Sequence, residues 1–210
     1  MSEIVKVENV TKYFKQEKVL DDVNMNLETG HIYGIVGKNG AGKTVLFKII
    51  AGFIKPSSGK VTVAGKIIGV DRDFPDNLGL IIETPGFLSQ YNAYQNLLYL
   101  ANINNKISKE DVKESIRMVG LDPGSNKKVG KFSLGMRQRL GIAQAIMENP
   151  NLIILDEPMN GLDKKGIEDV KELLLKLKGD GKTILMASHY AEDMEICDEV
   201  FQMEDGKLGD

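Results

Sequence analysis

One glycine-rich segment constrains the fold of this chain more than any other feature of the sequence. It reads Gly37-Lys38-Asn39-Gly40-Ala41-Gly42-Lys43-Thr44 and matches the pattern G-x-x-x-x-G-K-[ST]. The apolar run 32–36 before it predicts a buried strand, and apolar residues at helical spacing follow it. In a strand–loop–helix of this kind the glycines let several backbone N–H groups point at one anion, and the helix start adds positive charge. We therefore expect a nucleotide's phosphates to bind here, with Lys43 on the β- and γ-phosphates and the Thr44 hydroxyl on Mg²⁺.

A second segment carries two carboxylates at the end of a predicted strand. Residues 152–155 are all apolar and are followed directly by Asp156 and Glu157. A buried strand would hold Asp156 rigidly, in a position suited to Mg²⁺ and its water ligands, and Glu157 would then be placed to act as a general base on an attacking water. An acidic junction between a strand and a loop is common by itself, so this prediction depends on the phosphate loop that precedes it in the chain.

Strand and helix patterns predict a single α/β domain over 1–210 with a helical insertion. The alternation of strands and helices in the last part of the chain favours a largely parallel sheet covered by helices. We assign 1–84 and 131–210 to an α/β core and 85–130 to the insertion. Strands are expected at 4–10, 18–27, 32–36, 60–64, 152–155 and 183–187, and helices from 43, over 92–102 and 109–119, from the N-cap Ser133, and from the N-cap Asp163 to Gly179.

Composition narrows the classes of protein to consider. Of the 210 residues 42% are apolar and 27% are charged, and the net charge is −3, so we expect no basic surface for nucleic acid. The single cysteine, Cys197, cannot form an internal disulfide. No signal peptide is visible, and no apolar stretch approaches the ~20 residues needed to cross a bilayer. A membrane process would therefore need another chain for its membrane part.

The segment before the acidic strand resembles a known family motif. Phe132-Ser133-Leu134-Gly135-Met136-Arg137-Gln138-Arg139 lies at a predicted helix start and resembles the signature sequence of ABC (ATP-binding cassette) ATPases, usually Leu-Ser-Gly-Gly-Gln. Its order relative to the phosphate loop and the acidic strand also matches that family. Asn160-Gly161-Leu162-Asp163 resembles the family's D-loop, and His189 resembles the switch histidine that senses the γ-phosphate. The segment 10–14 resembles the one whose aromatic residue stacks on adenine, where Phe14 aligns better than Tyr13.

The resemblance implies a P-loop NTPase of the ABC ATPase type, with an N-terminal antiparallel β subdomain beside the helical insertion. It implies ATP and Mg²⁺ as cofactors, and a site divided between two subunits in a head-to-tail sandwich, either a homodimer or a heterodimer. Catalytic roles fall to Glu157 and His189, and metal binding falls to Thr44, Glu83 and Asp156. Nucleotide binding falls to Phe14, Gly37, Lys38, Asn39, Gly40, Ala41, Gly42, Lys43, Thr44, Val45, Ser133, Gly135 and Asp163.

Four positions depart from the family's usual motifs. Val45 stands where a hydroxyl residue usually reaches the α-phosphate, which removes a hydrogen bond worth about 1 kcal/mol. Leu134 and Met136 replace a glycine and the glutamine of the signature. Glu83 stands in the place of the glutamine of the family's glutamine loop. The Glu83 segment and the altered signature together resemble the ATPases of bacitracin-resistance and lantibiotic-immunity exporters.

The leading interpretation is ATP hydrolysis that drives a separate integral membrane permease from the cytoplasmic face of the cell membrane. The cargo is expected to be a peptide antibiotic or a similar amphipathic substrate. Docking candidates in the insertion are Tyr91, Tyr94, Leu97 and Leu98, and the Glu83 loop would adjoin them. One alternative is a soluble ABC ATPase without a permease, such as an iron–sulfur assembly factor. Another is a weakly hydrolysing regulatory subunit, which the altered signature permits.

Overall fold

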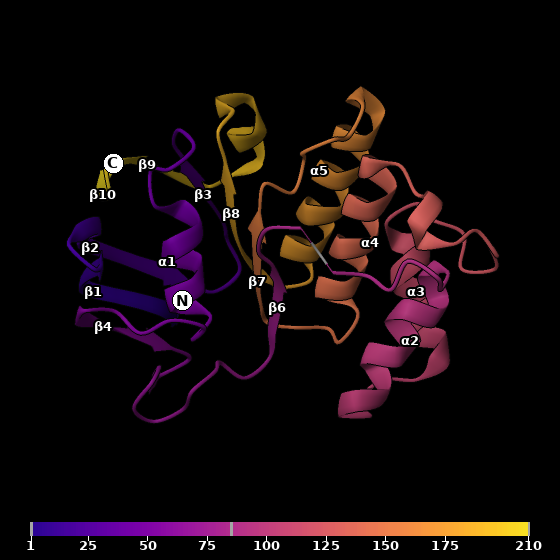
Figure 1. The fold of residues 1–210 in the computed structure, drawn as a ribbon, viewed down its shortest axis with the longest axis horizontal. Helices are drawn as coiled ribbons and strands as arrows, with labels where there is room; N and C mark the ends of the chain where they lie inside the picture. The colour runs from indigo at the N-terminus through magenta and orange to yellow at the C-terminus, as the bar shows by residue number, and fades with distance from the viewer. Residues whose placement is uncertain (1, 85, 210) are drawn as a thin grey trace.

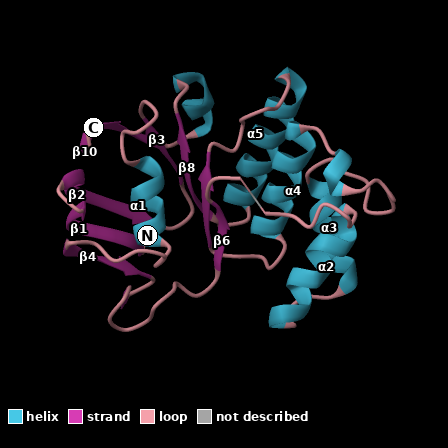
Figure 2. Cartoon of the chain, viewed as in Figure 1, coloured by secondary structure: helices cyan, strands magenta, loops and turns pink. Residues whose placement is uncertain are grey.

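The computed structural model describes residues 2–84 and 86–209 and contains two β-sheets with helices packed around them (Figures 1 and 2). The strands are β1 (Glu3–Phe14), β2 (Glu17–Glu28), β3 (Ile32–Val36), β4 (Ser58–Val63), β5 (Lys66–Ile67), β6 (Leu78–Ile81), β7 (Leu152–Asp156), β8 (Thr183–Ser188), β9 (Glu199–Glu204) and β10 (Lys207–Gly209). The α-helices are α1 (Lys43–Ile50), α2 (Ala93–Asn104), α3 (Lys109–Met118), α4 (Leu134–Ile146) and α5 (Lys164–Gly179), and short 3-10 helices are η1 (Val129–Lys131) and η2 (Ala191–Ile196).

The central sheet has six strands in the order β10-β9-β3-β8-β7-β6. Its strands pair in parallel except at β10, which runs antiparallel to β9. Every residue of β3, β7 and β8 is buried, as expected for parallel strands covered on both faces. This sheet places the carboxyl ends of β3, β7 and β8 at one edge, where the phosphate loop, the acidic pair and His189 follow their strands.

Two apolar cores lie on opposite faces of the central sheet. Ile153 and Leu155 of β7 join one core, and the alternate residues Leu152 and Ile154 join the other, because side chains alternate across a strand. The first core contains side chains of α2, α3, α4 and α5, and the second contains those of α1 and of the antiparallel sheet. Figure 1 shows the same arrangement, with α1 and the antiparallel strands on one side of the sheet and α5 and α4 on the other.

The second sheet has four strands in the order β2-β1-β4-β5, and all of its pairings are antiparallel. It is formed by the first part of the chain, as the sequence predicts. In the helical segment, Asn92 is the N-cap of α2 and forms a capping box with Gln95, and Ser108 is the N-cap of α3 and forms one with Asp111. Such caps stabilise a helix by about 1 kcal/mol and fix where it starts.

Most predicted elements are confirmed, and four strands were missed. β5, β6, β9 and β10 were not predicted from the sequence. β6 is short and contains Gly79, which packs against the backbone carbonyl of Ala145 at the end of α4, so its pattern is weak in isolation. The predicted end of α5 at Gly179 is confirmed, and the glycine in the left-handed conformation lies two residues further on, at Gly181, with a φ of 80°.

Candidate nucleotide-binding site

The phosphate loop joins β3 to α1 and is held open by two glycines in left-handed conformations. Gly40 has a φ of 85° and Gly42 a φ of 109°, values that side-chain-bearing residues avoid. A Cβ on Gly42 would also lie 2.9 Å from Leu20 Cδ2 and 3.0 Å from the Val19 carbonyl. Gly42 is the N-cap of α1 and gives it no side-chain cap, so the first-turn N–H groups of the helix face the loop. This arrangement is suited to an anion.

Lys43 connects the phosphate loop with the acidic side of the site. Its side chain is buried, and its Nζ donates to the carbonyl of Gly37 at 2.5 Å and to that of Lys38 at 3.2 Å. The same Nζ lies 3.8 Å from a carboxylate oxygen of Glu157. The ammonium group of Lys43 therefore lies close to both the phosphate loop and the Glu157 carboxylate that follows β7.

Thr44 and Asp156 form the second link across the site. The Thr44 hydroxyl donates to Asp156 Oδ2 at 2.6 Å. Burial raises the pKa of the Asp156 carboxyl above its ordinary value, the Thr44 hydrogen bond opposes that rise, and the Glu157 charge adds to it. A hydroxyl and a carboxylate at this distance are oxygen donors of the kind that Mg²⁺ prefers, so the residues fit the expected metal.

Glu157 and His189 lie in direct contact. His189 Nδ1 and Glu157 Oε2 are 2.8 Å apart. Glu157 has a φ of 52°, a left-handed conformation that turns its side chain away from the strand direction of β7. Its backbone is fixed by an N–H donated to Ala187 and by the Gln138 amide, which donates to the Glu157 carbonyl at 3.0 Å. Gln138 was not singled out from the sequence, because its role depends on α4 packing beside β7.

A cavity of about 270 Å³ lies over the phosphate loop. Its lining contains the predicted residues Asn39, Gly40, Ala41, Gly42, Lys43, Thr44, Val45, Asp156 and Glu157, together with Val19. Val19 was missed because it reaches the loop from β2, far away in sequence. Phe14 is not among the lining residues; it is about half exposed, and Lys12 Nζ lies 5.1 Å from its ring centroid.

The signature and D-loop residues lie away from this cavity and contact each other. Ser133 caps α4 by accepting from the Met136 N–H at 3.2 Å, and Asp163 caps α5 by accepting from the Gly166 N–H at 2.9 Å. A Cβ on Gly135 would lie 2.9 Å from the Gly161 carbonyl, so only glycine permits this approach without a shift.

The altered signature residue Leu134 packs beside that contact. Its side chain fills the space next to Gly161 and remains 59% exposed. The signature helix and the D-loop therefore form one packed unit.

The Glu83 side chain is turned towards α1, whereas the Glu83 backbone forms a hydrogen bond with the Asp156 carboxyl. The Glu83 carboxylate lies 2.5 Å from Lys48 Nζ, one helical turn beyond Thr44. Glu83 has a φ of 60° and a side chain that is 64% exposed. It lines a neighbouring cavity of about 170 Å³ that also touches Asp156 and Glu157. The sequence could not show Lys48 as its partner, since the two residues are far apart in the chain.

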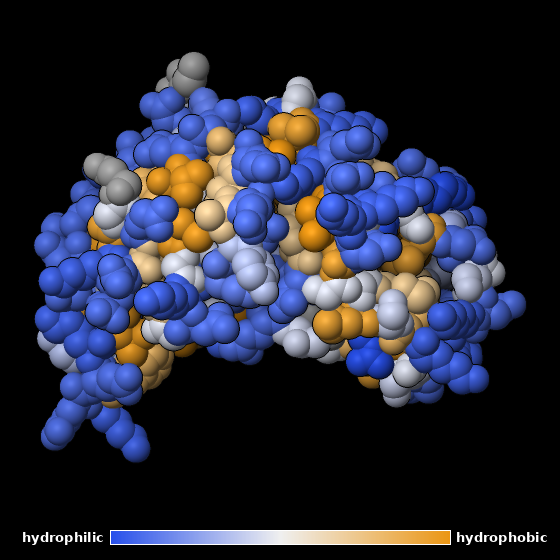
Figure 3. Space-filling view, turned by 90° about the horizontal axis from the view of Figure 1, so that it is seen from above, coloured by the Kyte–Doolittle hydropathy of each residue, from blue (hydrophilic) through white to orange (hydrophobic). Residues whose placement is uncertain are grey.

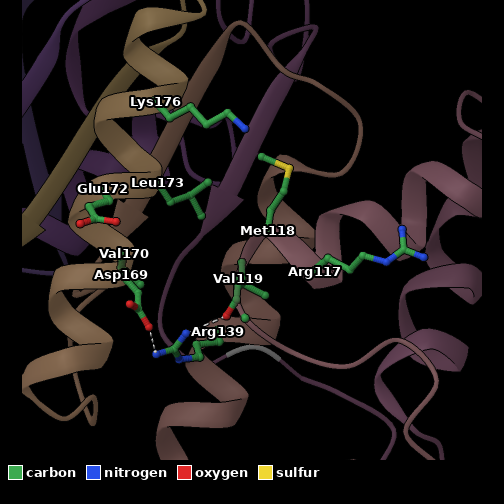
Figure 4. Close-up of a pocket in the computed structure, with 10 residues that line it drawn as sticks. Arg117, Met118, Val119, Arg139, Asp169, Val170, Glu172, Leu173 and Lys176 are labelled. Atoms are coloured by element: carbon green, nitrogen blue, oxygen red, sulfur yellow. Dashed lines mark hydrogen bonds and ion pairs between the residues drawn. The ribbon is translucent and has the colours of Figure 1, made fainter.

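A larger cavity of about 450 Å³ lies between α3, α4 and α5 and shares no lining residue with the phosphate-loop cavity (Figure 4). Arg139 of α4 crosses it, donating to the Val119 carbonyl at 2.8 Å and to Asp169 of α5 at 2.8 Å. These bonds tie the end of α3 to α5. The same cavity is lined by Arg117, Glu172 and Lys176. Because positive and negative side chains both line it, it favours neither an anionic nor a cationic ligand.

Comparisons with known proteins agree with this geometry. Residues 20–160 match the family model described as ABC transporter. The ABC transporter ATP-binding protein YybJ of Bacillus subtilis (strain 168) is 44% identical over 98% of this chain and 94% of its own length. The bacitracin transport ATP-binding protein BcrA of Bacillus licheniformis is 41% identical over 99% of this chain and 69% of its own length. The lantibiotic transport ATP-binding protein SrtF of Streptococcus pyogenes is 35% identical, with 98% and 89% covered.

Solved structures extend the likeness to the whole fold. A dimeric ATP-binding cassette in a post-hydrolysis state, bound to ADP and phosphate, superposes with a TM-score of 0.89 at 26% identity and covers 99% of this chain. The fold and the site thus define a P-loop α/β ATPase of the cassette type. The chain belongs to the ABC transporter family, and it is an ATPase that binds ATP. The alternative of an ATPase without a permease finds no support among these relatives.

Among the described residues, no helix combines the length and the apolar character that crossing a membrane requires.

Proposed function

We propose that this chain pairs with a second cassette and uses ATP hydrolysis to drive a separate membrane permease that exports a peptide antibiotic. The observation that carries the ATPase part is the assembly of the Lys43, Thr44, Asp156, Glu157 and His189 side chains at one sheet edge, with Glu157 2.8 Å from His189 and Thr44 2.6 Å from Asp156. The export part is supported by the similarity to BcrA and SrtF, whose names describe bacitracin and lantibiotic transport.

Each residue of the site has a distinct part in this proposal. Lys43 leaves its loop carbonyls to neutralise the β- and γ-phosphates, and the N–H groups of the loop and of the start of α1 hold the phosphate oxygens. Glu157 accepts a proton from the attacking water, and His189 holds the Glu157 carboxylate in place. Thr44 and Asp156 would hold Mg²⁺, which when bound supplies charge stabilisation to the phosphate oxygens.

The second cassette completes the site from its signature helix. Ser133 and Gly135 lie at the N-terminus of α4, where unpaired N–H groups can face the γ-phosphate bound by the other subunit. Asp163 lies on the packed unit that the signature forms with the D-loop. A head-to-tail pair of this kind explains why these residues lie away from the phosphate cavity of their own chain. The pair is either two copies of this chain or a mixed pair.

The permease is proposed to dock against the helical insertion at the inner face of the membrane, with 85–130 moving relative to the core of 1–84 and 131–210. Of the residues expected there, Leu97 is fully buried and belongs to the core, while Tyr91 is 38% exposed. Tyr99 and Ile103, one turn apart on α2, expose 63% and 70% and supply the apolar contact that Leu97 cannot. Figure 3 shows one face of the molecule, where apolar atoms emerge in separate patches on a mostly hydrophilic surface.

A protection assay tests the export proposal. The chain is expressed together with a candidate multi-span permease in a sensitive bacterium, and the inhibitory concentrations of bacitracin and of a lantibiotic are measured. We expect protection against at least one of them, and loss of protection with Lys43→Ala. Equal sensitivity with and without the pair would refute the export proposal, and so would protection that survives Lys43→Ala.

A further inference from the structure

A buried serine at the end of β8 lies between two carboxylates. Ser188 is fully buried, and its hydroxyl donates to Asp193 Oδ2 at 2.5 Å. The same hydroxyl lies 3.5 Å from Glu157 Oε2, the oxygen that His189 contacts. Asp193 is only 7% exposed, and no Lys, Arg or His lies within 4.0 Å of its carboxylate in the described part of the chain. The Ser188 hydroxyl is therefore an important partner of a buried acid.

A serine hydroxyl has one proton to donate, so it can serve only one of the two carboxylates at a time. The Tyr190 N–H donates to Ser188 Oγ at 3.1 Å and takes one of its lone pairs. The 2.5 Å contact with Asp193 is the length of a charge-assisted bond, and the 3.5 Å contact with Glu157 is not. Asp193 therefore accepts the hydrogen bond from the single hydroxyl proton of Ser188.

This choice of partner affects the Oε2 oxygen of Glu157. Oε1 faces Lys43 Nζ at 3.8 Å, and Oε2 faces His189 Nδ1 at 2.8 Å. If the Ser188 proton turned to Oε2, it would fill the acceptor position that remains on this oxygen beside the one that His189 contacts. The carboxylate would then be held towards β8, with less capacity to accept a proton from water.

We propose that Asp193 is a positioning residue for ATP hydrolysis, which holds the Ser188 hydroxyl away from Glu157. The proposal rests on the role of Glu157 as the general base. η2 brings Asp193 back over the end of β8, helped by the Asp193 N–H that donates to the Tyr190 carbonyl at 3.3 Å. The Ser188 carbonyl also accepts the Gly37 N–H at 3.3 Å, so the same residue contacts the start of the phosphate loop.

Three variants separate this role from a purely structural one. Asp193→Leu removes the acceptor, so the Ser188 proton is left with Glu157, and kcat should fall about tenfold, the effect of one hydrogen bond to a charged group. The KM for ATP should stay within about twofold, because Lys43 and the loop are unchanged. Ser188→Ala, which has no proton to misdirect, should keep kcat within about twofold of wild type. The double variant should recover kcat to the same level.

The control is Glu192→Leu, an exposed acid on the same 3-10 helix, which should leave kcat unchanged. ATP affinity and melting temperature are measured for every variant, since Ser188→Ala leaves Asp193 without this donor. A wild-type kcat in Asp193→Leu, or a double variant as slow as Asp193→Leu, overturns the proposal. If Asp193→Leu does not fold, the double variant decides, because both partners are then apolar: wild-type kcat supports the proposal and a tenfold loss overturns it.

Glu157→Gln is measured in parallel to separate this proposal from the proposed function. A Glu157→Gln variant that still hydrolyses ATP at the wild-type rate refutes the role of Glu157 as base. An inactive Glu157→Gln together with an unaffected Asp193→Leu refutes the role of Asp193 alone.

Discussion

Replacing Glu83 by Gln tests why this chain carries an acid in its glutamine loop. The structure gives the carboxylate a specific partner, Lys48 Nζ at 2.5 Å, and the side chains are 64% and 30% exposed. An ion pair with this exposure contributes about 0.2–1 kcal/mol to stability. Gln keeps the shape and the left-handed backbone of Glu83, whose φ is 60°, so no further strain is added. For a chain of this size 1 kcal/mol corresponds to ~2–4 °C, so the melting temperature should fall by ~4 °C at most.

The expected functional effect of Glu83→Gln is on coupling. Glu83 does not line the phosphate-loop cavity, so ATP affinity should stay within about threefold. Its loop leads into the segment before α2, where the permease is proposed to dock, so the stimulation of ATPase activity by permease and cargo should change. The assay compares ATP affinity, basal turnover and permease-stimulated turnover in reconstituted vesicles.

Lys48→Gln is the matched control for the same pair. It removes the ion pair from the other side, so its stability loss should equal that of Glu83→Gln, and the double variant should lose no more than either. A fall in melting temperature above 10 °C, or an ATP affinity as weak as that of Lys43→Ala, would refute this assignment of Glu83.

Two hydrogen-bonded side chains and one buried thiol give three further tests. Thr44→Val removes the 2.6 Å bond to buried Asp156, a bond to a charged group worth about 1.5–3 kcal/mol, and should raise the Mg²⁺ concentration needed for half-maximal ATPase activity more than tenfold; an unchanged Mg²⁺ titration contradicts it. Arg139→Leu breaks the bonds to Asp169 and to the carbonyl that ends α3, and calorimetry should show a melting temperature lower by ~4–12 °C with ATP affinity retained. Burial raises the pKa of the Cys197 thiol to about 12, so at pH 8 a thiol reagent should label the folded protein at least a hundredfold more slowly than the unfolded chain; equal rates contradict it.

The raised pKa of Cys197 also determines how its contribution to stability changes with pH. The unfolded thiol ionises near 9.0 and the folded one only near 12, so the unfolded state loses protons first as the pH rises. The contribution of Cys197 to stability is therefore fully present below pH 9 and is lost as the pH rises above it. Denaturation at pH 8 and pH 10, compared between wild type and Cys197→Ala, checks the sign.

Most of the fold could be predicted from local patterns in the sequence. The phosphate loop could be predicted because its glycines, Lys43 and Thr44 lie within one short segment, and their chemistry depends on a single turn between a strand and a helix. The buried strands β7 and β8 could be predicted because parallel strands are apolar throughout. β6 was missed because Gly79 breaks its apolar run, and its need for glycine becomes clear only when α4 is packed against it.

The parts of the site that sequence did not predict depend on contacts between distant segments. Val19 reaches the phosphate cavity from the antiparallel sheet, and Lys48 of α1 binds Glu83, which follows β6. The contact of Ser188 with Asp193 needs η2 to fold back on the end of β8. No local pattern marks such pairs, because the strand and helix periods only say which face is buried. The roles expected for Phe14 and Asp163 stay predictions.

The shared site with Glu157 as its base is tested by measuring ATP turnover per chain at increasing protein concentration in the presence of Mg²⁺. The measurement compares wild type with Glu157→Gln and Ser133→Arg. We expect wild-type turnover to rise with concentration, and we expect Glu157→Gln to bind ATP and dimerise but to be slower by about 10²–10⁴-fold. Ser133→Arg should bind ATP normally and fail to activate its partner. A wild-type rate independent of concentration, or an active Glu157→Gln, would contradict the shared site with Glu157 as its base.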